Sequence, residues 1–197
     1  FSEIAFYSGI AETDWSWGAL LFDMDNDGYK DIYVCNGIYK DLTNQDFIEF
    51  FANEMYQKMA ISGIKTSQDS IIDIMPSNPV INYAYKNNHD LKFTNETKQW
   101  GFSTPSFSNG AAYGDLDNDG DLDLIVNNLN MPLFVYKNNS KNNYLKVSLK
   151  GEKPNTFAIG SIVEVYVNGQ TLRQELIPSR GFQSSVDYKM TFGLGSS

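Results

Sequence analysis

The sequence predicts a mainly β protein in which a repeated strand–acidic turn–strand unit is interrupted by a helical insert and followed by a small all-β module. Three observations lead to this prediction. Two similar stretches begin at Trp15 and Phe107, and each passes through an acidic turn into an apolar strand. Between them apolar residues recur at helical spacing. After Pro132 they alternate with polar residues, which is typical of strands.

The first predicted element is the repeated unit. Residues 15–22 and 107–114 each contain a Gly-Ala pair and lead into an acidic turn. The apolar stretches 32–35 and 122–126 follow as strands and end in Asn-Gly or Asn-Asn turns. Self-similarity at a fixed offset is typical of repeat folds, so we expect both copies to adopt the same structure.

The second predicted element is a helical insert at about residues 42–75. Thr43 followed by Asp46 resembles a capping box at the start of a helix. The apolar stripe of this helix consists of Phe47, Phe50, Phe51, Met55 and Met59. We expect the stripe to pack on a sheet rather than to line a ligand groove. Ser67 can cap a second, shorter helix that Pro76 ends.

The third predicted element is a small all-β module at residues 138–197. Its apolar or alternating stretches are separated by turns at Gly151, at Asn168-Gly169 and at Gly181. The Asn-Gly pair between alternating residues is a strong hairpin signal. The predicted domains are therefore 1–137, which includes the insert, and 138–197.

The composition limits the functions that this chain can have. Its 197 residues include 24 acidic and 15 basic side chains, which give a formal net charge of −9. Binding of nucleic acid by phosphate neutralisation needs the opposite sign, so nucleic acid is not an expected partner. The apolar runs are too short for a membrane span. One cysteine excludes an intramolecular disulfide, and one histidine leaves almost nothing for a zinc site.

The negative charge is concentrated in the two acidic turns. Four of the 24 acidic residues lie within 23–31 and five within 115–123. Carboxylates occupy positions 1, 3, 5 and 9 of each loop, and glycine occupies position 6. Carboxylates this close repel one another unless a cation compensates their charge. Calcium accepts about six to eight oxygen ligands in flexible geometry, whereas magnesium demands a tighter octahedron, so calcium is favoured.

The predicted calcium ligands are the residues at positions 1, 3, 5 and 9, together with the backbone carbonyl at position 7. They are Asp23, Asp25, Asp27, Tyr29 and Asp31 in the first loop, and Asp115, Asp117, Asp119, Asp121 and Asp123 in the second. The carboxylate of Asp121 is expected to stay free at the rim. An EF-hand is excluded because position 12 is Val34 or Val126 instead of glutamate. Two alternatives stay open: solvated turns without metal, and calcium that contacts a ligand directly.

Both units resemble FG-GAP/VCBS repeats, which are found in integrin α-subunit β-propellers. The resemblance rests on residues 17–31 and 109–123 and covers about 1–137. It implies a partial β-propeller of about two blades, in which the equivalent aspartates bind calcium in a hairpin loop of each blade. A propeller needs about four to eight blades. Since the chain also begins at Phe1 rather than Met, we expect a piece of a longer protein whose exposed strand edges favour oligomers.

Residues 138–197 resemble the ASPIC/UnbV module, which follows such repeats in secreted and cell-surface proteins. The matching segments are 160–165, 179–184 and 192–195, and the expected final strand is cut off at Ser197. The helical insert is similar to that of Bacteroidetes-type members. The resemblance implies an extracellular, cell-surface or periplasmic location in a bacterium, which agrees with weak sites that need millimolar calcium.

Other residues that could take part in catalysis or binding have simpler structural explanations. His89 lies in a polar turn and Cys35 inside a strand, so we expect a surface histidine and a small buried thiol. Trp15 and Trp17 share one strand face, where packing in the blade core is expected and stacking on a sugar is the alternative. Arg180 lies beside an aromatic residue in a turn, which would suit contact with an anion or carboxylate.

The sequence thus predicts a non-catalytic, calcium-stabilised module for extracellular binding or adhesion. Its expected partner is a protein or glycan at the cell surface. One alternative is an accessory part of a calcium-dependent polysaccharide-acting enzyme, since calcium-bearing propellers occur in lyases. Another is a purely structural spacer. The sequence contains no evident acid–base pair beside the acidic loops, nucleophile motif or phosphate-binding glycine loop.

Overall fold

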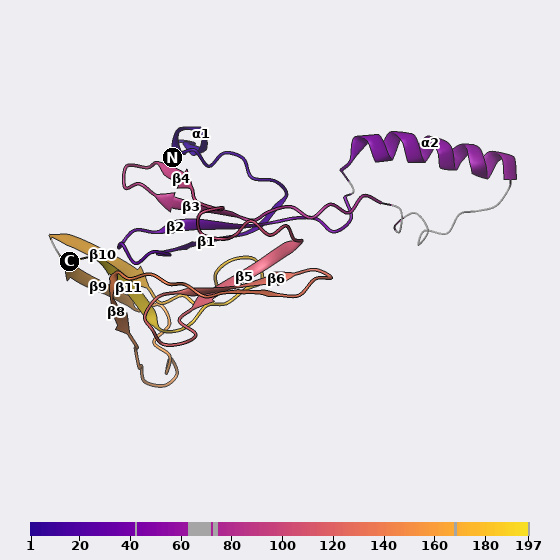
Figure 1. Ribbon diagram of the computed structural model, residues 1–197. Coiled ribbons are helices and arrows are strands. Elements are labelled where there is room, and N and C mark those ends of the chain that lie inside the picture. Colours follow the sequence, from indigo (N-terminus) through magenta and orange to yellow (C-terminus); the bar gives the residue numbers. More distant parts are fainter. Residues whose placement is uncertain (42, 63–71, 73–74, 168, 197) are drawn as a thin grey trace. The chain divides into compact units, whose positions relative to one another are not determined.

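The chain divides into two compact units, residues 1–37 with 80–197, and residues 38–79 (Figure 1). The computed structural model describes residues 1–41, 43–62, 72, 75–167 and 169–196. The first unit contains all eleven described strands, one short helix and both acidic loops. The fold is therefore mainly β, as the sequence predicts.

A four-stranded antiparallel sheet contains the first repeat. Its strands follow one another in chain order as β1 (Ser16–Phe22), β2 (Asp31–Asn36), β3 (Tyr83–Asn87) and β4 (Phe93–Asn95). A short helix, α1 (Ala5–Ser8), precedes them. The first acidic loop joins β1 to β2, and Phe22 pairs with Asp31 at its base. The insert interrupts the chain between β2 and β3 without interrupting the sheet.

A three-stranded antiparallel sheet contains the second repeat, as β5 (Ser108–Gly114), β6 (Asp123–Asn128) and β7 (Phe134–Tyr136). Gly114 pairs with Asp123, so the second acidic loop closes in the same register as the first. Both hairpins also have a register shift near the start of their first strand. The two copies therefore share one local structure, as their sequence similarity predicts.

The two sheets share one hydrophobic core. It includes Leu20 and Phe22 from β1, Tyr33 from β2, and Leu124 and Val126 from β6, all of which are buried. Because side chains alternate between the faces of a strand, every second residue of β1 points into this core.

Trp15 and Trp17 do not pack in this core, so that expectation is wrong. They are 42% and 41% exposed, and their ring centroids lie 6.5 Å apart. The buried residues of β1 are Gly18, Leu20 and Phe22, and the alternation places Trp17 on the opposite face. The spacing predicts that the two indoles share a face, but it does not say which face is covered.

The remaining strands form two antiparallel pairs. β8 (Asn143–Val147) pairs with β11 (Met190–Gly195), and β9 (Ile162–Val167) pairs with β10 (Gln170–Glu175). The predicted hairpin between β9 and β10 is present, and Gly169 in its turn has a φ of 76°, which glycine adopts without strain. Leu176, Met190 and Phe192 form a second, smaller core in this region.

The second unit contains α2 (Gln45–Ser62), where a helix is predicted. Asn44 caps it, since its Oδ1 accepts the N–H of Phe47 at 2.8 Å. The predicted capping box from Thr43 is wrong, because the Thr43 hydroxyl donates to Asp41 instead. The second predicted helix, which starts at Ser67, lies mostly outside the described residues. Packing of the apolar stripe on a sheet stays a prediction.

Candidate metal centres

The backbone takes the same shape in both acidic loops. Asn26 and Asn118, at position 4, have φ values of 58° and 63°. Gly28 and Gly120, at position 6, have φ values of 93° and 97°. Asparagine and glycine are the residues that adopt these left-handed conformations most readily. Each loop can therefore turn twice within a few residues and bring its carboxylates together.

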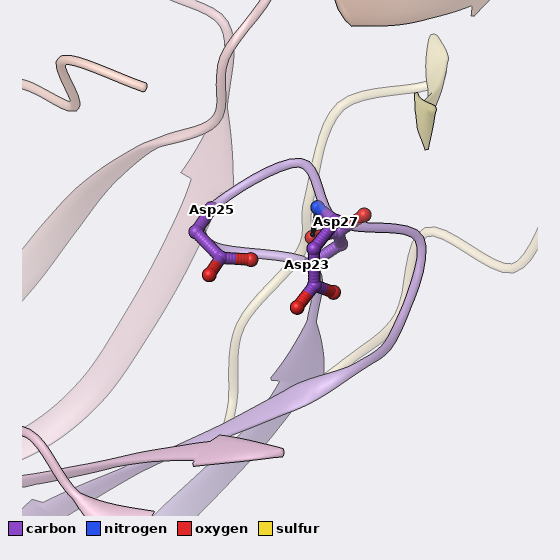
Figure 2. Close-up of side chains that lie close together, drawn as sticks. All are labelled: Asp23, Asp25 and Asp27. Atoms are coloured by element: carbon purple, nitrogen blue, oxygen red, sulfur yellow. Dashed lines mark hydrogen bonds between the residues drawn. The ribbon is translucent and has the colours of Figure 1, made fainter. Parts of the chain in front are cut away.

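Each loop gathers three carboxylates around one point. In the first loop, one oxygen each of Asp23, Asp25 and Asp27 lies within 4.8 Å of the others (Figure 2). In the second loop, Asp115, Asp117 and Asp123 come together within the same distance. Oxygen-only donor sets of this kind suit hard cations such as calcium.

The aspartate at position 9 ties each loop to an asparagine at the end of the third strand of its sheet or just after it. Asp31 accepts the N–H of Met24 at 2.9 Å with Oδ2 and the N–H of Asn87 at 2.8 Å with Oδ1. Asp123 accepts the corresponding pair of N–H groups in the second loop, at 2.9 and 2.8 Å. In each loop this carboxylate therefore bridges the turn and the neighbouring strand.

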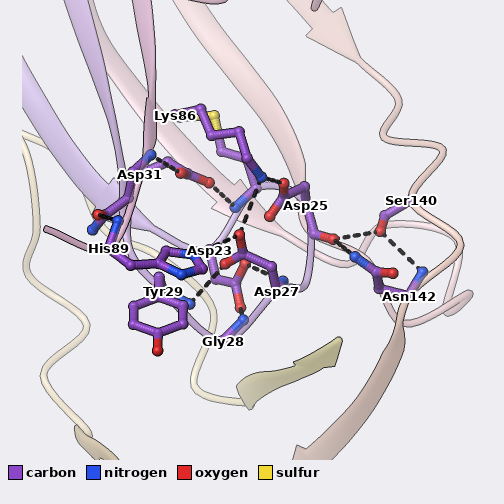
Figure 3. A network of polar contacts seen from close by, with 12 residues as sticks. Asp23, Asp25, Asp27, Gly28, Tyr29, Asp31, Lys86, His89, Ser140 and Asn142 are labelled. Atoms are coloured by element: carbon purple, nitrogen blue, oxygen red, sulfur yellow. Dashed lines mark hydrogen bonds and ion pairs between the residues drawn. The ribbon is translucent and has the colours of Figure 1, made fainter. Parts of the chain in front are cut away.

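A lysine ammonium lies against the carboxylates of each loop. Lys86 contacts Asp25, and its Nζ lies 3.1 Å from Oδ2 of Asp27 (Figure 3). Lys137 makes the equivalent contacts in the second loop, with its Nζ 3.3 Å from Asp119. Lys146 of β8 also contacts the Asp115 carboxylate of the second loop. One lysine thus contacts the four carboxylates of the first loop, and two lysines contact the five carboxylates of the second.

One lysine does not compensate the charge of the first loop. Burial, together with the charges of neighbouring aspartates, raises the pKa of Asp23 to about 7 and that of Asp31 to about 7. Asp27 behaves differently. Burial would raise its pKa as well, but hydrogen bonds from the Tyr29 N–H and from Lys86 hold it below its usual value. A further cation would stabilise the ionised forms of Asp23 and Asp31.

Several carboxylate oxygens in the loops are buried without a partner. Among the described residues, Oδ1 of Asp25, Asp115 and Asp121 receives no hydrogen bond. An unpartnered buried carboxylate oxygen costs free energy, because the water that would solvate it has been removed. These oxygens and the surrounding carboxylates fit a calcium ion in each loop.

Asp121 is not free at the rim, contrary to expectation. It is 3% exposed, and burial together with the neighbouring Asp119 carboxylate raises its pKa to about 7. The Tyr144 ring of β8 packs on the neighbouring Gly120, so closely that a Cβ on this glycine would overlap it.

The C-terminal strands also pack on the first loop. Gly193 of β11 lies so close that a Cβ there would overlap the Asp23 carboxylate. Ser140 and Asn142, in the segment before β8, both donate side-chain hydrogen bonds to the carbonyl of Asp25 at 2.8 Å (Figure 3). Contacts from β11 and from the segment before β8 thus hold the first loop in its shape.

The lysines and asparagines that complete the two loops are not among the residues predicted from sequence. They belong to the tetrapeptide Tyr-Lys-Asn-Asn, which occurs at 85–88 and again at 136–139. In both copies the lysine contacts the acidic loop, and the N–H of the first asparagine binds the aspartate at position 9. This repeated tetrapeptide is the signal that could have predicted them.

His89 lies in the turn between β3 and β4 and is exposed, as the sequence predicts. Its ring stacks on Tyr29 with 3.6 Å between centroids, and Nε2 lies 3.4 Å from Oδ2 of Asp27. Coordination of a metal by the Tyr29 carbonyl stays a prediction.

Cys35 is 1% exposed, and burial raises the pKa of its thiol to about 12, so it is the buried thiol that was expected.

Two family models match parts of the chain. The FG-GAP-like repeat matches residues 67–126, which include the second acidic loop. The ASPIC and UnbV family matches residues 151–197, which include β9, β10 and β11. No curated protein matches the chain. The chain therefore carries an FG-GAP-like repeat followed by an ASPIC and UnbV domain.

Proposed function

We propose that this chain is a non-catalytic binding module of an extracellular or periplasmic protein, and that calcium in its two acidic loops stabilises it. The two matched carboxylate clusters, with their unpartnered buried oxygens, are the observation that supports the calcium sites. The FG-GAP-like repeat and the ASPIC and UnbV domain support the assignment as an extracellular binding module.

Calcium would have a structural role in both loops. In the first loop Asp23, Asp25 and Asp27 would hold the ion, while Asp31 joins the loop to β3. The ion supplies the positive charge that removes the repulsion between these carboxylates. Because the Asp25 carbonyl is bound by the segment before β8, ordering of this loop also orders its contact with the C-terminal region.

The two sheets would be blades of a β-propeller whose other blades lie outside this sequence. β1 and β4 are the edges of the first sheet, and β5 and β7 are the edges of the second. Edge strands pair readily with further strands, so these edges offer places for a second copy of the chain. Origin in a Bacteroidetes-type bacterium stays a prediction.

The proposed location agrees with the calcium chemistry of the loops. No helix in the described part of the chain has both the length and the apolar character needed to cross a bilayer. Weak calcium sites are filled where calcium is millimolar, as it is outside the cell. An extracellular or periplasmic location would therefore keep both loops occupied.

An exposed row of aromatic rings supports a partner at the surface of this module. Trp17 lies 6.5 Å from Trp15 and 5.3 Å from Phe182 between ring centroids. Exposed aromatic side chains provide a large contact area at low entropic cost, which suits both glycans and proteins. We propose this row as the surface that contacts the partner.

Thermal melting of the metal-stripped chain, with calcium or magnesium added, tests the calcium proposal. Calcium that binds only the folded chain stabilises it by about 2.7 kcal/mol per site at a hundredfold excess over Kd. We expect a rise in melting temperature with millimolar calcium, little change with magnesium, and two calcium ions retained per chain.

Variants that each remove one negative charge distinguish the two sites. Asp25→Asn and Asp117→Asn are each expected to remove one ion, while Glu152→Gln, an exposed acid outside both loops, keeps both. If the wild-type chain shows no shift and retains no calcium in elemental analysis, the loops are solvated turns and the proposal is wrong.

A further inference from the structure

A cavity of about 430 Å³ lies between the first repeat and the C-terminal strands. Leu21 at the end of β1, Lys30 of the first acidic loop and residues of β10 and β11 line it. Ligand pockets in proteins span about 300 to 1,000 Å³. The volume therefore suits a ligand of about the size of one sugar ring, and all lining residues belong to the first unit.

Four cations line this cavity, and three of them have no carboxylate partner. Among the described residues, Lys30, Arg180 and Lys189 form no ion pair, whereas Arg173 pairs with Glu164. Asp23, Glu175 and Asp187 also line the cavity, but none of them lies within ion-pair distance of these cations.

The turn that carries Arg180 is fixed in place. Nη2 of Arg180 donates to the carbonyl of Glu175 at 3.1 Å, which leaves the other guanidinium N–H groups available. The next residue, Gly181, has a φ of 76°, and a Cβ there would lie 3.0 Å from Leu20. A cation held in this way loses little entropy when a ligand binds.

We propose that this cavity binds a carboxylate-bearing sugar, and that Arg180 and Lys30 bind its carboxylate. A guanidinium matches a carboxylate with two parallel hydrogen bonds, and an ammonium adds a second positive charge. The ring of Tyr113, which stacks on Phe22 with 4.5 Å between centroids, also lines the cavity, and so do the polar side chains of Gln170 and Thr171. The cavity thus offers polar side chains to the hydroxyl groups of a sugar and an aromatic ring in the same lining.

The proposal names a ligand class for the binding function proposed above and rests on that function. It uses a place on the surface other than the aromatic row of Trp15, Trp17 and Phe182. It also assigns a role to the Arg180 turn, which neither acidic loop explains. An acidic polysaccharide would present such carboxylates.

Calorimetric titration of sodium glucuronate into the full chain, at constant ionic strength, tests the proposal. Glucose has the same ring without the charge and is the matched ligand control. We expect glucuronate to bind and glucose not to bind. Arg180→Gln and Lys30→Gln should each weaken binding at least about tenfold, since each removes a charged hydrogen-bond donor. Arg180→Lys should retain part of the affinity, and Lys98→Gln, an exposed lysine outside the cavity, should retain all of it.

Three outcomes would overturn the proposal. The first is equal binding of glucose and glucuronate. The second is an Arg180→Gln variant that keeps both its unfolding midpoint and its affinity. The third is binding of inorganic sulfate as tightly as glucuronate, because the sugar ring would then contribute nothing.

Titration with calcium and with a chelator separates this proposal from the metal sites. If glucuronate still binds in the presence of the chelator, and calcium does not change the melting temperature, the cavity proposal is supported and only the calcium proposal is contradicted. If glucuronate binding requires calcium and is unchanged by Arg180→Gln, the cavity proposal is contradicted, because the metal would then hold the carboxylate.

Discussion

Lys86 in the first loop, and Lys137 with Lys146 in the second, determine how much charge a cation must supply to each acidic loop. The ammonium groups of Lys86 and Lys137 lie beside the carboxylates at positions 3 and 5, where a divalent ion would also bind. Burial opposes the charged form of Lys86, but hydrogen bonds to Asp25 and Asp27 outweigh it and raise its pKa. The lysine and the metal therefore compete for the same oxygens.

Replacement of Lys86 should strengthen calcium binding in the first loop. With Lys86→Met we expect the affinity of this site to rise about two- to fivefold, in line with the modest strength of partly exposed ion pairs. The metal-free variant should also melt at a lower temperature, because its carboxylates lose a partner. Calorimetric calcium titration measures the first effect, and Lys98→Met is the control. A lower calcium affinity would show that the lysine assists the metal instead.

The raised pKa values of Asp23 and Asp31 predict the pH dependence of the metal-free chain. Both values rise from 3.8 to about 7 on folding, so between these pH values the folded chain binds more protons than the unfolded chain. The free energy of unfolding therefore falls as the pH rises through this range. One pKa unit corresponds to about 1.4 kcal/mol, so the combined effect should reach a few kcal/mol.

Melting curves at pH 5 and pH 8 test this dependence. With a chelator the chain should melt at a higher temperature at pH 5, and the shift caused by calcium should be larger at pH 8, where no protons compete for the carboxylates. Asp31→Asn should flatten the profile of the metal-free chain. A metal-free chain that becomes more stable between pH 5 and pH 8 would contradict the assignment.

At the scale of elements, the Gly-Ala pair before each acidic loop has a structural explanation. A Cβ on Gly18 of β1 would lie 3.1 Å from the backbone N of Phe182, and one on Gly110 of β5 would lie 3.2 Å from its carbonyl oxygen. The same turn of the C-terminal region thus packs on the equivalent position of both repeats. Glycine at these positions leaves room for it.

Gly193 of β11 provides a sharper test of this packing. A Cβ in Gly193→Ala would overlap both the Asp23 carboxylate and the backbone of Asn26. We expect a loss of about 1–3 kcal/mol in the free energy of unfolding, typical of overpacking, and weaker calcium binding in the first loop. Gly114→Ala is the control, because its Cβ would meet Asp187 at an ordinary 3.5 Å. Equal stability of the two variants in urea would refute the contact.

Local patterns predict much of this fold, because they depend on neighbours along the chain. Alternation predicts the hairpin strands, helical spacing predicts α2, and the repeated aspartates predict both carboxylate clusters. The failures concern contacts with distant segments. Asp121 is buried in a loop on which Tyr144 packs, and the exposure of Trp17 depends on which face of β1 the second sheet covers. Spacing alone contains neither piece of information.

At the scale of the whole molecule, the repeats and the C-terminal strands form one compact unit. Asn138 shows how closely they are joined, since its side-chain amide donates to carbonyls of both acidic loops, Met24 at 2.6 Å and Leu122 at 3.2 Å. The second loop in turn receives a hydrogen bond from Asn26 at 3.3 Å, through the carbonyl of Gly120. Binding of an ion in one loop should therefore affect the other.

Removal of the C-terminal region tests this connection. The fragment 1–137 lacks Ser140, Asn142 and Gly193, all of which pack on the first loop. We expect its first site to bind calcium at least about tenfold more weakly than the full chain, because the hydrogen bonds from Asn138, Ser140 and Asn142 that order the loop are lost. Calcium titration of fragment and full chain, with circular dichroism to monitor folding, measures the difference. Equal affinity in a folded fragment would show that the loops act independently.

The insertion point between β2 and β3 has a practical consequence. Val34 pairs directly with Tyr83, so the chain leaves and re-enters the sheet on adjacent strands, although the second unit separates these strands in the sequence. Such a junction can accept a foreign domain in place of residues 38–79, provided that the ends of that domain lie close together. A fluorescent protein spliced there would be joined to the same hairpin that carries the first acidic loop, and its emission could report the state of that loop.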